Sequence, residues 1–271
     1  MESVILKNCL DDYFHRGSTS IRGAFDARVC NLVETVAGAI DEKRYQDAVK
    51  AISALDVEAQ RIMRSQFSRN VLHAREKEWT GHGINRTFRF WSADQKKNYL
   101  LFTVEVCDAL RERYLAALGY GSVLSIVREN DLIPHDDDLD IIVSIPRAET
   151  PVYRDALVDL HNFLEAKGFL VSGSYLAHRH VGNGKFLLDV FLGLSEENFV
   201  SWHPGPRRKI CFGEVFPVST ASLYGVECAI PAAPESYLEH VYGKDWRTPV
   251  PGWTHDFNPA KYSDWFWPKR V

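Results

Sequence analysis

The chain has 271 residues, 45% of them apolar, which is enough for one large or two small hydrophobic cores and excludes a mainly disordered chain. Lysine and arginine number 32 against 36 aspartate and glutamate, and the net charge of −4 excludes a polycation that coats nucleic acid. Residues 101–271 carry 23 of the acidic and 16 of the basic side chains, so we expect a metal site in this part of the chain.

The cysteines and the first residues indicate a reducing compartment. Five cysteines, widely spaced and without a CxxC pair, predict neither a disulfide framework nor a zinc finger. The start, MESVILKNCLDDYF, lacks the basic residues and long apolar run of a secretory signal, and no uncharged apolar stretch approaches the roughly 20 residues that cross a bilayer. We therefore expect a cytoplasmic protein. Peripheral association with a membrane through its substrate stays open, and so does the formation of an oligomer.

Helical periodicity dominates the first hundred residues. Apolar residues at a spacing near 3.6 predict helices over 41–55 and 56–75. A third helix is predicted from an N-cap near Asp94 to Leu118, with Gly119 as its stop. We therefore expect a helical N-terminal region over residues 1–93, followed by a second domain over residues 94–271.

Strand patterns begin after the third helix. A β-branched run predicts a strand over 138–144, and two strands near 175–181 and 186–192 flank an Asn-Gly pair, which predicts a hairpin with a two-residue loop. The other predicted elements are a helix over 147–167, strand fragments around 210–218, a helix near 234–241 and an ordered Trp- and Pro-rich tail over 246–271.

Four carboxylates crowd into five residues, namely Asp136, Asp137, Asp138 and Asp140. In a strand Asp138 and Asp140 share one face, with Asp136 a candidate for the same face, and the alternate residues are apolar. Two carboxylates at i and i+2 backed by an apolar layer suit a Mg²⁺ ion (or Mn²⁺) in phosphate chemistry. A solvated acidic loop is the alternative, whereas an EF-hand is not indicated because Ile141 stands where that motif needs glycine.

A single acid interrupts the apolar second strand of the predicted hairpin. A lone carboxylate at Asp189 is costly unless it is ligated or hydrogen-bonded, so we predict a third metal ligand there. A two-residue loop pairs Gly182 with Lys185 and sets His178 directly opposite Asp189. His178 then positions or deprotonates an acceptor hydroxyl, or only hydrogen-bonds the carboxylate.

A short Gly/Ser segment before the acidic cluster is a candidate phosphate site. Gly121 and Ser122 precede a predicted helix over 123–128, and free backbone N–H groups at a helix start bind phosphate. Ser122 fits an ordinary N-cap equally well.

Arginines supply further candidates for an anionic ligand. Arg128 is a possible phosphate partner, with an ion pair to Glu129 or Asp131 as the alternative. Arg207 and Arg208 begin a compact basic loop that binds an anionic ligand or is only solvated.

Several separated motifs, met in order between residues 100 and 250, resemble the LicD family, which includes the fukutin-related proteins. The matching segments are Gly121-Ser122-Val123-Leu124, Arg128-Glu129, the run LIPHDDDLDI from Leu132, Leu188-Asp189-Val190-Phe191, Phe216-Pro217, Ile230-Pro231 and the run YGKDW from Tyr242. Asp136, Asp138 and Asp140 match the acidic motif of the family, and Asp189 matches its later acid.

The resemblance implies an α/β (α+β) nucleotidyltransferase-like fold, a mixed sheet with helices on one side, in which the aspartates hold Mg²⁺. It also implies transfer of phosphocholine, a phospho-alditol or a phospho-sugar from a nucleotide-activated, usually CDP-linked, donor to a glycan or glycolipid hydroxyl in surface polysaccharide synthesis. Two alternatives stay open: a nucleotidyltransferase that attaches the nucleotide and releases pyrophosphate, and a non-catalytic glycan- or nucleotide-binding module. Nucleic acid is not expected as a partner.

Overall fold

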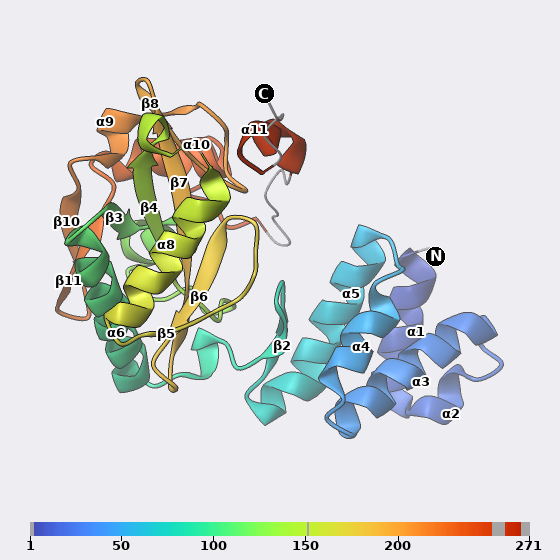
Figure 1. Ribbon diagram of the computed structural model, residues 1–271. Coiled ribbons are helices and arrows are strands. Elements are labelled where there is room, and N and C mark those ends of the chain that lie inside the picture. The colour runs from blue at the N-terminus through green and yellow to red at the C-terminus, as the bar shows by residue number, and fades with distance from the viewer. Residues whose placement is uncertain (1–2, 151, 251–257, 267–271) are drawn as a thin grey trace. The chain divides into compact units, whose positions relative to one another are not determined.

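The computed structural model describes residues 3–150, 152–250 and 258–266 of the chain (Figure 1). The chain forms two compact units, one of residues 1–91 together with 134–137, the other of 92–133 together with 138–271. The first unit thus ends two residues before the expected boundary at residue 93. The return of residues 134–137 to this unit was not predicted.

The first unit consists mainly of helices. They are α1 (Ser3–Arg16), α2 (Ser18–Ile21), α3 (Ala27–Asp41), α4 (Tyr45–Ile52) and α5 (Val57–Phe67), followed by a hairpin of β1 (Glu78–Thr80) and β2 (Gly83–Asn85). The helix predicted over 56–75 starts as expected, because the Asp56 carboxylate accepts a hydrogen bond from Ala59 N–H at 2.8 Å. The helix predicted over 41–55 is present as the shorter α4, because the chain first turns after α3, where Lys43 adopts a left-handed φ of 59°.

The second unit combines strands and helices. Its strands are β3 (Leu115–Leu118), β4 (Asp140–Pro146), β5 (Leu170–Ser172), β6 (His178–Gly182), β7 (Leu187–Glu196), β8 (Phe199–Trp202), β9 (Ile210–Cys211), β10 (Ser219–Leu223) and β11 (Val226–Ile230). Its helices are α6 (Ala93–Arg111), α7 (Tyr120–Leu124), α8 (Tyr153–Ala166), α9 (Phe212–Val215), α10 (Pro234–Tyr242) and α11 (Ser263–Phe266).

The central sheet of the second unit has the order β3-β4-β7-β6-β5, which confirms the predicted mixed sheet. β4 and β7 are parallel, and the other neighbours are antiparallel. The long strand β7 pairs with β6 along its first half and with β8 along its second half, and β8 in turn pairs with β9. Gly193 permits the close pairing of β7 with β8, because a Cβ there would lie 2.4 Å from the Trp202 ring.

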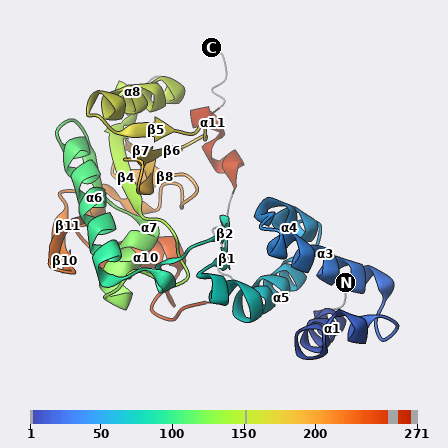
Figure 2. The same cartoon turned by 90° about the horizontal axis from the view of Figure 1, so that it is seen from below.

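Helices cover both faces of the sheet, whereas we expected them on one side only (Figures 1 and 2). α8 packs on one face, where the Tyr153 hydroxyl donates to the Leu192 carbonyl at 2.6 Å. α7 and α10 pack on the other, in a cluster that includes Ile142 and Tyr237. The reason is visible in β4, in which consecutive side chains from Ile141 to Val143 are all fully buried and therefore supply two apolar faces.

The third predicted helix ends earlier than the sequence indicates. α6 begins after Ser92, which caps it together with Gln95, and ends at Arg111. The apolar residues Leu115–Leu118 form β3 instead, because their backbone pairs with β4 in the sheet. A short apolar run fits a helix end and a buried strand equally well, and tertiary pairing decides between them.

The end of the chain also differs from the prediction. Residues 212–215 form α9 and not a strand, and the tail expected as loop is helical over 259–266, with Tyr262 and Trp265 buried. The other parts of that tail prediction, residues 251–257 and 267–271, lie outside the described residues. Among the helices of the described chain, none is long and apolar enough to span a membrane.

Candidate active site

Three carboxylates converge where β4 and β7 run side by side. Asp140 is the first residue of β4 and pairs in register with Asp189 of β7, so both side chains lie on the same face of the sheet. Asp138 precedes β4, although the sequence placed it within the strand. Each of the three offers a carboxylate oxygen within 4.8 Å of the others. The structure therefore brings together the three acids that the sequence singled out, although Asp140 and Asp189 are 49 residues apart in the chain.

Backbone hydrogen bonds fix the position of Asp140. Its N–H donates to Ser122 Oγ at 2.7 Å, and its carbonyl accepts from Gly119 N–H at 3.0 Å. Ser122 is 1% exposed and lies inside α7, so its interpretation as an N-cap is wrong: Gly119 occupies that position. Gly121 lies half-buried in the same helix. Contact of Gly121 or Ser122 with a donor phosphate stays a prediction.

Tyr99 holds the two acidic segments together. Its hydroxyl accepts from Leu139 N–H at 3.0 Å and donates to the Leu187 carbonyl, so it joins the backbone before Asp140 to the backbone before Asp189. Burial, followed by the charge of Asp138, raises the pKa of Tyr99 well above its usual value, so the hydroxyl keeps its proton as a donor. No sequence signal marks this role, because it depends on two distant backbone groups.

The donor set fits Mg²⁺ or Mn²⁺. Mg²⁺ prefers oxygen ligands at about 2.0–2.1 Å, which places neighbouring ligand atoms about 3 Å apart and opposite ones about 4.2 Å apart. The oxygens of Asp138, Asp140 and Asp189 already lie within 4.8 Å of one another. Three like charges at this distance repel one another, and a divalent cation offsets that repulsion.

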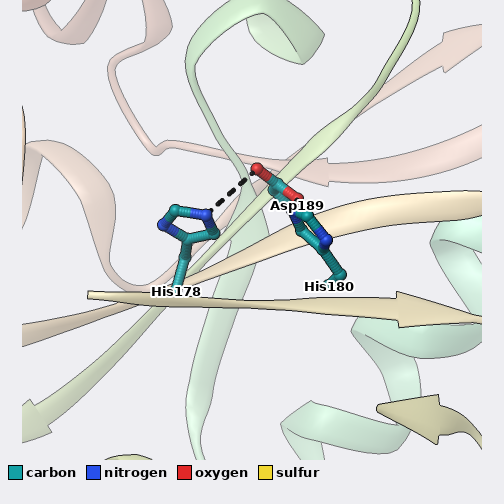
Figure 3. Close-up of side chains that lie close together, drawn as sticks. All are labelled: His178, His180 and Asp189. Atoms are coloured by element: carbon teal, nitrogen blue, oxygen red, sulfur yellow. Dashed lines mark ion pairs between the residues drawn. The ribbon is translucent and has the colours of Figure 1, made fainter. Parts of the chain in front are cut away.

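Two histidines flank Asp189 on the neighbouring strand β6 (Figure 3). The Nε2 atom of His180 lies 3.3 Å from Asp189 Oδ1, and that of His178 lies 3.7 Å from Oδ2. The predicted register is wrong, because His180 and not His178 stands directly opposite Asp189. The shift of the pairing by two residues leaves His178 on the same face, since strand side chains alternate with a period of two.

The register differs because the hairpin loop has four residues. Gly182 pairs with Leu187, and Asn183 Oδ1 accepts from the N–H groups of Lys185 and Phe186 at 3.1 and 3.0 Å. Gly184 adopts a left-handed φ of 84° inside this turn. The Asn-Gly pair thus marks the turn correctly but not its length.

Asp136 and Asp137 belong to the segment that packs with the first unit. Asp136 Oδ1 accepts from Asp137 N–H at 3.0 Å, and the Asp136 carbonyl accepts from Phe88 N–H at 2.8 Å. Asp137 is held by Asn85 Nδ2 at 2.6 Å and by His82 Nδ1 at 3.0 Å. A ligand role for Asp136 stays a prediction.

The candidate arginines have protein partners. Arg128 forms an ion pair with Glu129 at 2.7 Å, which is the alternative that the sequence analysis gave. Arg128 also donates to the Trp246 carbonyl at 2.9 Å. Asp131 pairs with Lys96 instead. A phosphate contact of Arg128 stays a prediction.

Arg207 and Arg208 lie near the far end of β7. Arg207 pairs with Glu196 at 2.7 Å and with Asp264 at 2.9 Å, and the Nε atom of Arg208 lies 3.4 Å from the same glutamate. Glu196 is seven residues from Asp189 along the strand, which corresponds to about 23 Å. The structure therefore does not bring Arg207 to the carboxylates.

The sequence of the second unit matches a known domain family. Residues 115–233 match the sequence model of the LicD/FKTN/FKRP nucleotidyltransferase domain. These residues form a LicD-family domain. The resemblance read from the motifs is thereby confirmed, and the LicD-family domain contains Asp138, Asp140, Asp189 and both flanking histidines.

Solved structures with a similar fold include two of the protein ANT(2'')-Ia. A solution structure of this antibiotic-resistance factor has 16% sequence identity and a TM-score of 0.37, and the aligned region covers 53% of this chain and 71% of the ANT(2'')-Ia chain. A crystal structure of ANT(2'')-Ia in complex with adenylyl-2''-tobramycin has 18% identity and a TM-score of 0.34, and covers 52% of this chain and 75% of its own. No curated protein matches the chain significantly.

Proposed function

We propose that the LicD-family domain is a Mg²⁺- or Mn²⁺-dependent phosphotransferase. It moves a phospho-alditol, phosphocholine or phospho-sugar group from a nucleotide-activated, CDP-linked donor to a glycan hydroxyl in the synthesis of a surface polysaccharide or glycolipid. The observation that carries the proposal is the convergence of Asp138, Asp140 and Asp189 at the start of β4 within the matched domain. The family resemblance supports the choice of donor and acceptor classes.

The protein's own residues serve binding and orientation. The three carboxylates hold the ion, which when bound neutralises the oxygens of the donor diphosphate. His178 and His180 flank Asp189 within the candidate site, and on this ground we assign to His178 the positioning of the acceptor hydroxyl. Holding the two reactants in line and stabilising the developing charge together supply most of the rate enhancement in such a reaction. The acceptor hydroxyl gives up its proton to solvent, its oxygen bonds to the distal phosphorus of the donor, the bond from that phosphorus to CMP breaks, and CMP leaves.

An exposed apolar surface beside the site suits a glycolipid acceptor. Leu170 and Leu187 are 61% and 51% exposed and flank Gly182 in the pairing of β5, β6 and β7. Leu187 lies two residues before Asp189 and therefore on the same face of β7. Peripheral membrane association belongs to the proposal on this ground.

The experiment is a screen of CDP-linked donors that measures the release of CMP by the purified full chain. We expect release that requires both a divalent ion and a glycan acceptor, and that Asp140→Asn abolishes. Asp159→Asn is the matched control, because this exposed aspartate lies on α8 and outside the carboxylate cluster. Equal release by wild type and Asp140→Asn would sink the proposal.

The alternative is a nucleotidyltransferase, which the description of the matched domain favours. Such an enzyme takes a nucleoside triphosphate, joins the nucleotide to the acceptor and expels pyrophosphate. The two reactions share the carboxylate site and differ in the phosphorus that faces the acceptor. A non-catalytic binding module differs from both, because it lacks Mg²⁺ or Mn²⁺ binding that the nucleotide strengthens.

A further inference from the structure

The side chains of His178, His180 and Asp189 form a second cluster of potential metal ligands beside the three carboxylates. The three ligand atoms lie within 4.8 Å of one another and come from two neighbouring strands (Figure 3). His180 stands directly opposite Asp189, and His178 stands two residues away on the same face. Each side chain is partly shielded, with 20%, 28% and 16% of the side chains of His178, His180 and Asp189 exposed.

Both distances exceed the length of a charge-assisted hydrogen bond and are compatible with ligands around one ion. The two Nε2 to carboxylate separations are 3.3 Å for His180 and 3.7 Å for His178. A charge-assisted N–H to oxygen bond has a length of about 2.7–2.9 Å. Ligands at about 2.0–2.1 Å from a tetrahedral zinc ion lie about 3.3–3.4 Å apart. Only small side-chain movements would therefore close this group around an ion.

Aromatic packing holds both imidazole rings in place. The Tyr175 ring stacks on the His178 ring, with 4.3 Å between the ring centroids and 12° between the ring planes. The centroid of the Tyr175 ring lies 4.8 Å from that of His180. Phe191 packs on His178 at 4.8 Å. Rings oriented in this way lose little freedom when they bind an ion, and orientation of ligating histidines by their surroundings is a general feature of metal sites.

We infer that His178, His180 and Asp189 bind one divalent transition-metal ion, such as Zn²⁺, in a site that shares Asp189 with the three-carboxylate site. Imidazole nitrogens select Zn²⁺, Fe²⁺ or Co²⁺ over Mg²⁺, so the two sites differ in the ion they prefer. Three protein ligands leave coordination positions open, as in catalytic zinc sites. The role of this ion in the reaction rests on the proposed function: His178 would position the acceptor hydroxyl through the ion that it binds.

The test is a titration of the metal-free full chain with Co²⁺, in excess Mg²⁺ that fills the carboxylate site. We expect about one equivalent of Co²⁺ to bind with visible absorption bands of nitrogen coordination and to raise the melting temperature. His180→Ala and His178→Ala each weaken binding by at least about tenfold, since loss of an outer partner alone costs roughly 10- to 100-fold. His161→Ala is the matched control, because His161 lies on α8. Asp140→Asn retains the bands.

Equal Co²⁺ spectra for wild type and both histidine variants would overturn the inference, as would a wild-type chain that binds no Co²⁺. Far-UV circular dichroism checks the fold of each variant, and His180→Asn replaces His180→Ala if the latter does not fold. The binding measurement is independent of transfer. Co²⁺ bound by a chain that releases no CMP from any donor contradicts the proposed function alone, and CMP release without a Co²⁺ site contradicts this inference alone.

Discussion

At the scale of single residues, the site brings like charges together. Asp138→Asn and Asp140→Asn should each abolish turnover, because each removes a metal ligand. The melting temperature in the absence of metal should be equal to or higher than that of wild type, since the substitution relieves repulsion between carboxylates. Metal-dependent CMP release and thermal unfolding in EDTA measure the two effects. A variant that stays active in Mg²⁺ contradicts the assignment of its carboxylate as a ligand.

Tyr99 is expected to act as a positioning residue. Tyr99→Phe leaves Leu139 N–H and the Leu187 carbonyl without this partner and should lower the free energy of unfolding by about 1–3 kcal/mol. It should also lower turnover, because both acidic segments lose their common anchor. Tyr153→Phe is the matched control: it removes a buried hydroxyl that donates to the Leu192 carbonyl, three residues beyond Asp189 along β7. Denaturant unfolding and CMP release of both variants check this, and equal turnover of the two variants would refute the role.

At the scale of elements, the antiparallel pairing of β7 with β8 depends on one glycine, Gly193. Gly193→Ala places a methyl group 2.4 Å from the Ser201 carbonyl and the Trp202 ring, so it should destabilise the protein by about 1–3 kcal/mol or more. Gly213→Ala is the control, since a Cβ there has no neighbour within 4 Å. Chemical denaturation of both variants is the measurement. A Gly193→Ala protein as stable as the control would contradict the close approach of β7 and β8 at this residue.

The elements also show how far the sequence leads. The burial cost of a lone carboxylate predicted that Asp189 would join the acidic run, and the structure sets it opposite Asp140. The register error between β6 and β7 still left His178 on the face of Asp189, because a shift by two residues preserves the face. The sequence pattern failed on loop length, since Asn-Gly occurs in two- and four-residue turns. It also failed on residues 115–118, whose strand exists only through pairing with β4. The role of Tyr99 depends on two distant backbone groups and leaves no local pattern.

At the scale of the whole molecule, we expect buried tyrosines to lower the stability at alkaline pH. Burial raises the pKa of Tyr99, Tyr120 and Tyr153 well above the usual value of 10.0. A group with a raised folded-state pKa contributes stability below its unfolded pKa, and this contribution is lost as pH rises toward the folded value. The melting temperature should therefore fall above about pH 10, with tyrosine ionisation coinciding with unfolding. Ionisation that precedes the loss of structure would contradict this expectation.

The most direct test of the central claim is a phosphorus NMR spectrum of the complete reaction. The full chain is incubated with Mg²⁺, a CDP-linked donor and a glycan acceptor, and in parallel with CTP and the same acceptor. We predict CMP and a new phosphodiester that carries the donor's head group on the acceptor, without pyrophosphate in either reaction. Pyrophosphate formed from CTP, with the nucleotide joined to the acceptor, would contradict the account and establish the nucleotidyltransferase alternative.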